Sequence, residues 1–292
     1  MQDLFDLIGN TPLVDLSHLQ TNPAVRLYGK LEGNNPGGSV KDRAALGMIM
    51  GARERGELDG RKAIVEATSG NTGIALAMIA ARLGQPITLI MTENSTVERV
   101  QTMRAYGAEV LLTPAERTIE YCRELAEEMA ATGDYVQLNQ FANNDNWRAH
   151  YRTTGPEIWR DTKGQITHFV SSMGTTGTIT GTGRYLHEAN PAVRIVGVQP
   201  TEGSRIPGIR RWSPAFLPKI YDDSVPDLKL DVSEDEAIAT MRRLAREAGV
   251  FAGMSSGGAV TAALRVAETL EEGLLVAIIC DRGDRYLSQG IY

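Results

Sequence analysis

The fold class is indicated by one stretch, Lys62-Ala63-Ile64-Val65-Glu66-Ala67-Thr68-Ser69-Gly70-Asn71-Thr72-Gly73. Residues 62–67 are mostly apolar and predict a short strand. The polar, glycine-containing turn 68–73 follows, and the alanine-rich segment 74–83 predicts a helix that Gly84 closes. A strand, a turn and a helix in direct succession are typical of an α/β protein.

The same alternation extends along the rest of the chain. Further strands are predicted at 86–91, 109–112, 135–138, 167–173, 194–199 and 274–281, and further helices at 95–107, 115–132, within 147–162, from Thr178 onward, at 233–248 and at 257–270. Ser95 and Glu98 have the spacing of a capping box at the start of the helix 95–107. Repeated winding of this kind gives a mostly parallel sheet with helices on both faces.

A polar, asparagine-rich link at 139–146 interrupts this rhythm, and the strand–helix pattern resumes after it. We therefore expect an α/β protein with two doubly wound, mostly parallel sheet domains and a cleft between them. A smaller, mobile domain is expected to span 36–145, and a larger domain 1–35 and 146–292. In such sheets, ligands bind beyond the carboxyl ends of the strands, where polar turns lie in this sequence.

The composition is that of a globular protein, because 42% of the 292 residues are hydrophobic. No stretch approaches the ~20 consecutive apolar residues of a membrane span. The acidic N-terminus lacks the basic start of a signal peptide, and the net charge of −6 argues against a nucleic-acid surface. The cysteines, Cys122 and Cys280, have neither disulfide-framework nor metal-ligand spacing. We expect a cytoplasmic, metal-free enzyme with no membrane or nucleic-acid partner.

Gly174-Thr175-Thr176-Gly177-Thr178 follows the strand predicted at 167–173. Its glycines let backbone amides turn toward an anion, its threonines add hydroxyl donors, and the helix start adds positive potential. The turn is neither a Walker A loop nor a GxGxxG motif, and it predicts a phosphate cradle. The turn 68–72 has the same design but no counter-charge, which suits a small carboxylate.

Lys41 lies where the loop Asn35-Pro36-Gly37-Gly38-Ser39-Val40 meets a helix start. The field of the helix dipole there lowers the pKa of the amine, which favours its action as nucleophile and base. A third turn, Gly253-Met254-Ser255-Ser256-Gly257-Gly258, also precedes a helix. One lysine and two anion-binding turns are the parts with which an enzyme holds an aldehyde cofactor through an imine and binds a carboxylate substrate.

Several motifs occur in the order and spacing of a known family. They are Ile8-Gly9-Asn10-Thr11-Pro12-Leu13, Gly38-Ser39-Val40-Lys41-Asp42-Arg43, and the turns at 68–73, 174–178 and 255–258. With them the chain resembles the fold-type II pyridoxal-phosphate enzymes of the cysteine synthase family over essentially its full length. The segments 207–212 and 278–287 are similar to the B type of that family, the O-acetylserine sulfhydrylases B.

The resemblance implies a role for each motif. Lys41 would form the covalent bond to pyridoxal 5'-phosphate in the larger domain and later take the substrate's α-proton. Asn71 would bond the cofactor's ring hydroxyl. Ser255 would meet the pyridine nitrogen and leave it largely neutral, which suits β-elimination over transamination. The phosphate would be held by Gly174, Thr175, Thr176, Gly177 and Thr178, and the substrate carboxylate by Thr68, Ser69, Gly70, Asn71 and Thr72.

The implied reaction is a β-replacement on O-acetyl-L-serine through an aminoacrylate intermediate. Sulfide would give L-cysteine, thiosulfate would give S-sulfocysteine, and acetate would leave. Arg210 and Arg211, in a loop with Gly208, would bind the thiosulfate dianion, and Cys280 would shape the floor of the cleft. The alternatives are a serine or threonine dehydratase, a cystathionine β-synthase-like enzyme, or a catalytically silent regulatory homologue. The resemblance also suggests a homodimer.

Overall fold

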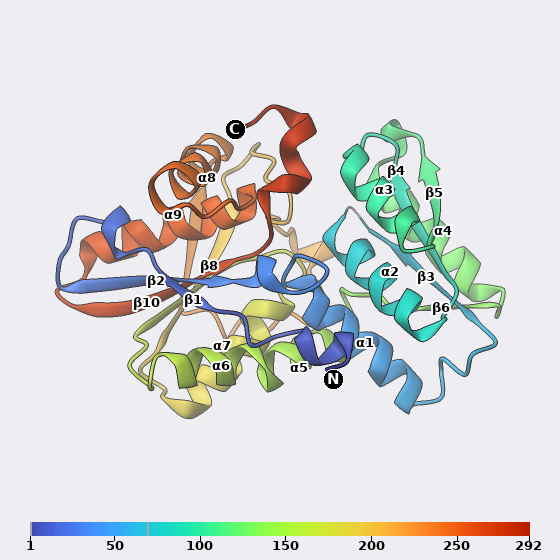
Figure 1. Cartoon of the computed structure of the whole chain (residues 1–292), viewed down its shortest axis with the longest axis horizontal. Coiled ribbons are helices and arrows are strands. Elements are labelled where there is room, and N and C mark those ends of the chain that lie inside the picture. Colours follow the sequence, from blue (N-terminus) through green and yellow to red (C-terminus); the bar gives the residue numbers. More distant parts are fainter. Residues whose placement is uncertain (1, 69) are drawn as a thin grey trace.

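The computed structural model describes residues 2–68 and 70–292, and these form two sheets with helices around each (Figure 1). The four-stranded sheet has the order β5-β4-β3-β6, and all of its neighbouring strands are parallel. Its strands are β3 (Ala63–Ala67), β4 (Ile87–Thr92), β5 (Glu109–Thr113) and β6 (Tyr135–Gln137). The whole of this sheet falls within the range 36–145 that the sequence predicts for a smaller domain.

The six-stranded sheet has the order β1-β2-β10-β7-β8-β9, in which β1 is antiparallel to β2 and the other pairs are parallel. Its strands are β1 (Leu13–Asp15), β2 (Val25–Leu31), β7 (His168–Ser172), β8 (Arg194–Pro200), β9 (Leu228–Val232) and β10 (Gly273–Ile279). The two sheets confirm the expected α/β class with mostly parallel strands.

Helices cover both faces of the smaller sheet, because successive side chains of a strand point to opposite faces. Ile64 of β3 packs in a core with α1 (Lys41–Glu54), α2 (Asn71–Leu83) and α3 (Val97–Ala105). Its neighbour Val65 packs in a second core with α4 (Thr118–Ala131). The sheet is therefore buried on both sides, as parallel sheets are.

The larger sheet is covered in the same way. Leu275 and Ala277 of β10 pack in a core with α8 (Glu234–Ala248) and α9 (Met254–Thr269). Val276 and Ile278 face the opposite core, which includes α6 (Thr154–Asp161) and α7 (Gly177–Ala189). The remaining helix, α5 (Asn144–Arg152), packs against both α1 and α7 and so joins the two halves.

Several local predictions were wrong. Strands β1, β2 and β9 were not predicted; β2 contains Arg26, Gly29 and Lys30, which are not typical strand residues. The predicted helix within 147–162 is two helices, because the chain bends at Thr153. The predicted capping box of Ser95 and Glu98 is absent, because the N-cap residue of α3 is Thr96, whose side chain makes no capping hydrogen bond.

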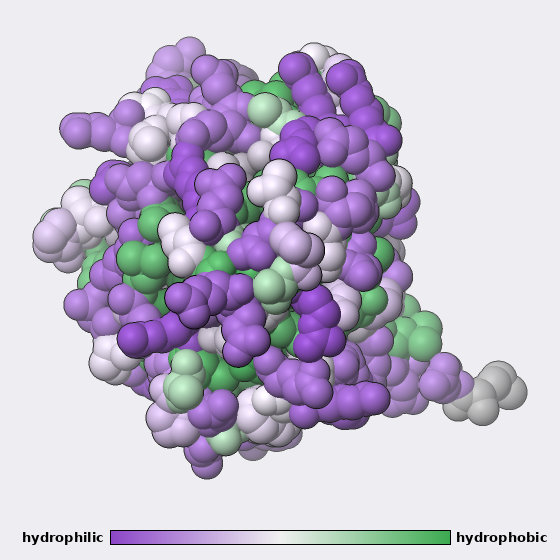
Figure 2. Space-filling view, turned by 90° about the vertical axis from the view of Figure 1, so that its left-hand side faces the viewer, coloured by the Kyte–Doolittle hydropathy of each residue, from purple (hydrophilic) through white to green (hydrophobic). Residues whose placement is uncertain are grey.

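Short 3-10 helices complete the described structure, at Leu4–Leu7, Ser17–Leu19, Glu32–Asn34, Ala115–Arg117, Pro214–Phe216 and Gly283–Gln289. The face shown in Figure 2 is mainly hydrophilic, with small hydrophobic patches between the polar side chains. Within the described residues, no helix combines the length and the apolar character needed to cross a bilayer.

Candidate active site

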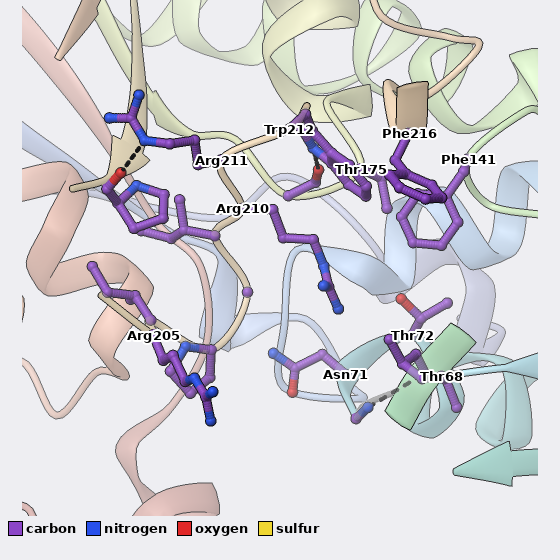
Figure 3. Close-up of a pocket in the computed structure, with 18 of the residues that line it drawn as sticks. Thr68, Asn71, Thr72, Phe141, Thr175, Arg205, Arg210, Arg211, Trp212 and Phe216 are labelled. Atoms are coloured by element: carbon purple, nitrogen blue, oxygen red, sulfur yellow. Dashed lines mark hydrogen bonds between the residues drawn. The ribbon is translucent and has the colours of Figure 1, made fainter. Parts of the chain in front are cut away.

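A cavity of about 740 Å³ is lined by residues of both halves of the molecule (Figure 3). Lys41 contributes from the start of α1. Thr68, Gly70, Asn71 and Thr72 contribute from the turn after β3, and Gly174 and Thr175 from the turn after β7. The segment 200–213 borders the opposite wall. The carboxyl ends of two parallel strands therefore face one cavity, as expected for open α/β sheets.

Lys41 is the first residue of α1 and is partly buried. Burial lowers the pKa of its amine, while the charge of the neighbouring Asp281 opposes that shift. The direction agrees with the sequence prediction, and burial is a cause that the sequence prediction did not include. The preceding Val40 donates its backbone N–H to the Cys280 carbonyl over 2.8 Å, which fixes the loop that carries Lys41 against the end of β10.

The turn after β3 is organised by the buried hydroxyl of Thr68. Its Oγ1 accepts backbone N–H bonds from Gly70 at 3.2 Å and Gly73 at 3.1 Å. The hydroxyl of Thr72 donates to the side-chain oxygen of Gln140 at 2.7 Å. The turn thus presents polar groups to the cavity from the start of α2. The prediction for Ser69 concerns a residue outside the described part of the chain.

Asn71 sits between two charged side chains of the C-terminal segment. Its Nδ2 donates to the Asp281 carboxylate at 2.7 Å, and its Oδ1 accepts from Arg285. Arg285 thereby fixes the orientation of the amide, and of its two N–H groups one donates to Asp281 and the other makes no hydrogen bond to the described residues. This orientation is compatible with the ring-hydroxyl role that the resemblance implies.

The turn after β7 is bent at Thr176, whose φ of 71° lies in the left-handed region. Thr176 is also the N-cap residue of α7, and its side chain makes no capping hydrogen bond. The loop that contains Gly208 and Trp212 packs on this turn. The Trp212 side chain donates to the Gly174 carbonyl at 2.8 Å, and a Cβ atom built on Gly174 would lie only 2.5 Å from the Gly208 carbonyl oxygen. Thr178 contacts the buried His150 over 3.3 Å.

Ser255 and Ser256 differ in what their hydroxyls do. The Ser256 hydroxyl accepts the backbone N–H of Cys280 at 2.9 Å and is therefore used within the fold. Ser255 is buried in the first turn of α9. It lies close behind Gly208, a residue that lines the cavity: a Cβ atom built on Gly208 would be 3.5 Å from the Ser255 hydroxyl.

Cys280 follows the end of β10. Burial raises the pKa of its thiol to about 11, so this thiol is neutral.

The two adjacent arginines point in different directions (Figure 3). Arg210 extends across the cavity toward Asn71 and Thr72, with its guanidinium 5.7 Å from the centre of the Trp212 ring. Arg211 is exposed; it donates to the Pro200 carbonyl at 2.9 Å and pairs with Asp231. Arg210 therefore faces the candidate site, whereas the charge of Arg211 is turned away from it.

Comparison with known proteins gives a consistent result. The pyridoxal-phosphate dependent enzyme family matches residues 4–281. A protein named Cysteine synthase B from Pseudomonas aeruginosa is 60% identical over 98% of this chain and 96% of its own length. The chain belongs to the cysteine synthase B family of pyridoxal-phosphate-dependent enzymes.

Two further matches agree with this assignment. Cysteine synthase B of Escherichia coli is 56% identical over 100% of this chain and 96% of its own. A crystal structure of a Cysteine Synthase (OASS) from Entamoeba histolytica superimposes with a TM-score of 0.94 at 35% identity, covering 100% of this chain and 90% of that one. The cofactor of the family is pyridoxal phosphate, as the resemblance implied.

The side chains present here fit that cofactor. Thr176 Oγ1 is buried and lacks a hydrogen-bond partner among the described residues, as a phosphate-binding hydroxyl does before its ligand arrives. At the start of α7 the side chain of the N-cap residue Thr176 makes no capping bond, and the Thr175 hydroxyl accepts the Gly177 N–H at a long 3.4 Å. Gly174 to Thr178 would hold the phosphate, Lys41 the aldehyde carbon, Asn71 the ring hydroxyl and Ser255 the ring nitrogen.

Gln140 is one of the residues of the cavity that sequence reasoning missed. It lies in the asparagine-rich link, is buried and accepts the Thr72 hydroxyl. The link was interpreted only as a boundary between domains. Its unusual density of amide side chains was the available signal, because buried amides need specific partners.

Proposed function

We propose that this member of the cysteine synthase B family makes L-cysteine from O-acetyl-L-serine and sulfide, releasing acetate. One observation carries the proposal: Lys41, with a pKa lowered by burial, lines the same cavity as both polar turns. The matched relatives named cysteine synthase support the same reaction. The substrate's carboxylate would then bind at 68–72, opposite the phosphate turn at 174–178.

The protein's own residues supply binding, orientation and proton transfer. Pyridoxal phosphate, when bound, supplies the electron sink for the negative charge that develops at the substrate's α-carbon. The Lys41 amine, partly neutral because its pKa is lowered, would take the α-proton. Ser255, as a neutral partner, would leave the ring nitrogen uncharged. The acetate and then the sulfur donor would pass through the cavity mouth beside Arg210.

The test follows the visible absorption of the bound cofactor. Adding O-acetylserine should shift the absorption to longer wavelength, and adding sulfide should restore it with formation of cysteine. A shift followed by pyruvate and ammonia, with no response to sulfide, would indicate a serine dehydratase-like lyase. Cystathionine formed from homocysteine at a higher kcat/KM than cysteine from sulfide would indicate a cystathionine β-synthase-like enzyme. An unchanged spectrum would indicate a catalytically silent homologue.

The proposal includes thiosulfate as a second sulfur donor, which would give S-sulfocysteine. Arg210 supports this part, because a guanidinium directed into the cavity favours a dianion over the smaller sulfide. We expect Arg210→Ala to raise the KM for thiosulfate about tenfold, the loss of one charge-assisted hydrogen bond, and to change the KM for sulfide little.

Arg211→Ala is the matched control for that measurement. Its guanidinium is held by Asp231 and Pro200, so it should affect the two donors equally and weakly. This differs from the sequence interpretation, in which both arginines bind the donor. Equal increases of both KM values in Arg210→Ala would argue against a thiosulfate-binding role of Arg210, and a wild-type protein that forms no S-sulfocysteine would rule out thiosulfate as a donor.

We propose further that the enzyme is cytoplasmic and forms a homodimer. Its smaller domain, 36–145, would close on the larger one when the substrate binds. Light scattering on the purified protein tests the dimer, and a mass of one chain would rule it out. Small-angle scattering with and without a bound amino acid tests the closure, since a domain movement compacts the molecule.

A further inference from the structure

The glutamate that precedes the carboxylate turn is buried. Glu66 lies in β3, two residues before Thr68, and only 2% of it is exposed. Its carboxylate accepts the backbone N–H groups of Asn139 at 2.9 Å and Gln140 at 3.2 Å. A buried carboxylate is costly unless such donors satisfy it. These bonds tie the end of β3 to the link that follows β6.

That link has a conformation that needs support. Asn139 has a φ of 51°, in the left-handed region, which costs roughly 1–3 kcal/mol for a residue other than glycine. Asn143 donates its side-chain amide to the Leu138 carbonyl at 2.9 Å, so the bend is held from its other side as well. Glu66 and Asn143 together fix the backbone from which Gln140 extends.

Gln140 brings this support to the cavity. Because its Oε1 accepts the Thr72 hydroxyl at 2.7 Å, its amide nitrogen is the group left to donate to a ligand. Within the described part of the chain, that nitrogen makes no hydrogen bond. Gln140 lines the cavity beside Thr68 and Thr72. An amide donor in this place suits the carboxylate of an amino acid.

Asn146 extends the connection to the other turn. Its Nδ2 donates to the Gln140 carbonyl at 2.7 Å and to the Thr175 hydroxyl at 3.2 Å. Only 2% of Asn146 is exposed, and a Cβ atom at Gly177 would collide with its side chain. The side chain therefore fills the space between the link and the phosphate turn.

We propose that Glu66 and Asn146 are positioning residues that hold Gln140 in place to bind the amino-acid carboxylate, and that Asn146 couples this subsite to the phosphate turn. This inference rests on the proposed function, because it assumes that the ligand at 68–72 is an amino acid. Burial raises the pKa of Glu66 to about 7, although the backbone N–H groups of Gln140 and Asn139 and the charge of Arg123 favour its ionised form.

The experiment uses the holoenzyme and two ligands that differ only at the carboxylate, L-serine and L-serinamide. Their Kd values are measured from the absorption change of the bound cofactor. We expect Glu66→Gln to weaken L-serine binding about tenfold and L-serinamide binding little. Glu109→Gln is the matched control, since Glu109 is a hydrogen-bonded glutamate of the same sheet on β5, on the surface.

A double-mutant cycle separates positioning from general damage to the fold. If Glu66 acts through Gln140, Glu66→Gln should have little further effect on L-serine binding in a Gln140→Ala background. Additive losses, or equal losses for both ligands, would overturn the role of Glu66. These outcomes are read from binding alone, so they remain distinct from a failure of the wild-type protein to make cysteine.

Asn146→Ala tests whether Asn146 couples the carboxylate subsite to the phosphate turn. It also keeps the proposal testable if the Glu66→Gln variant does not fold. We expect it to weaken both L-serine binding and retention of pyridoxal phosphate, each about tenfold, because it touches both turns. Exposed Asn144→Ala is its control. Loss of cofactor with unchanged L-serine affinity, or the reverse, would show that Asn146 serves one turn only and would overturn the coupling.

Discussion

At the scale of single residues, Lys41 shows how burial prepares a functional group. Its ammonium is partly removed from water at the start of α1, and the resulting drop in pKa increases the neutral fraction of the amine. The charge of Asp281 opposes the shift and favours the protonated amine. A group that both takes and returns the α-proton needs this balance.

We expect Lys41→Ala to abolish turnover, by at least about three orders of magnitude, since no neighbouring amine can replace it as nucleophile and base. Borohydride reduction of the wild-type holoenzyme followed by peptide mapping should label Lys41. In the variant the cofactor should be released by gel filtration under denaturing conditions. A label on Lys30 or Lys62 in the wild type would contradict the assignment of Lys41 as the residue that binds the cofactor covalently.

At the scale of elements, the two halves of the protein contain the same strand–turn–helix arrangement. In each, a strand of a parallel sheet ends in a threonine- and glycine-containing turn that leads into a helix, α2 in one case and α7 in the other. In each turn a threonine hydroxyl accepts a backbone N–H of the helix start, Thr68 from Gly73 and Thr175 from Gly177. Under the proposed function, the remaining N–H groups and the hydroxyls would bind an anion in both. What distinguishes them is the enclosing wall: Gln140 at the first turn, Gly208 and Trp212 at the second.

The two turns should therefore separate in function. Thr72→Ala is expected to raise the KM for O-acetylserine about tenfold with normal cofactor content, since it removes the hydroxyl bonded to Gln140. Thr176→Ala should weaken retention of pyridoxal phosphate first, measured by dialysis and absorbance. Thr72→Ser and Thr176→Ser, which keep the hydroxyl, are the controls. The opposite pattern would mean that phosphate and carboxylate bind at the other turn.

The elements also show what the sequence could predict. Lys41 and the turns 68–72 and 174–178 were predictable, because each lies in a contiguous motif: Lys41 at the start of a helix, and each turn between a strand and a helix. The bond from Thr72 to Gln140 and the pairing of Arg211 with Asp231 were not, because they join residues that only the tertiary fold brings together. The same applies to Lys30, a charged residue within β2 whose burial depends on partners from α6.

At the scale of the whole molecule, a buried ion network joins four segments next to the Lys41 loop. Arg43 pairs with Glu32 at 2.7 Å and with Glu157 at 2.6 Å, and Lys30 pairs with Glu157 at 2.8 Å. The N-terminal segment joins through Thr11, whose hydroxyl donates to Glu32 at 2.6 Å. Removal of one partner from such a network leaves a buried charge unpaired, which costs roughly 3–5 kcal/mol.

This network predicts how the protein responds to acid. Burial by itself would raise the pKa of Glu157, but Arg43 and Lys30 outweigh it and hold the pKa at about 2, below the ordinary value of 4.5. A carboxylate whose pKa is lowered by folding stabilises the protein above its unfolded-state pKa, and that stabilisation is lost as the pH falls toward the folded-state pKa. The free energy of unfolding should therefore decrease between about pH 5 and pH 2.

Urea titrations at several pH values measure this dependence. Glu157→Gln should be less stable than the wild type at pH 7 by a few kcal/mol, since Arg43 and Lys30 lose a charged partner. Because glutamine does not titrate, the difference between the two proteins should narrow as the pH falls below 5. Exposed Glu268→Gln is the control and should follow the wild-type curve. A constant difference at all pH values would show that Glu157 stabilises the fold by packing and hydrogen bonding, and that its charge contributes nothing.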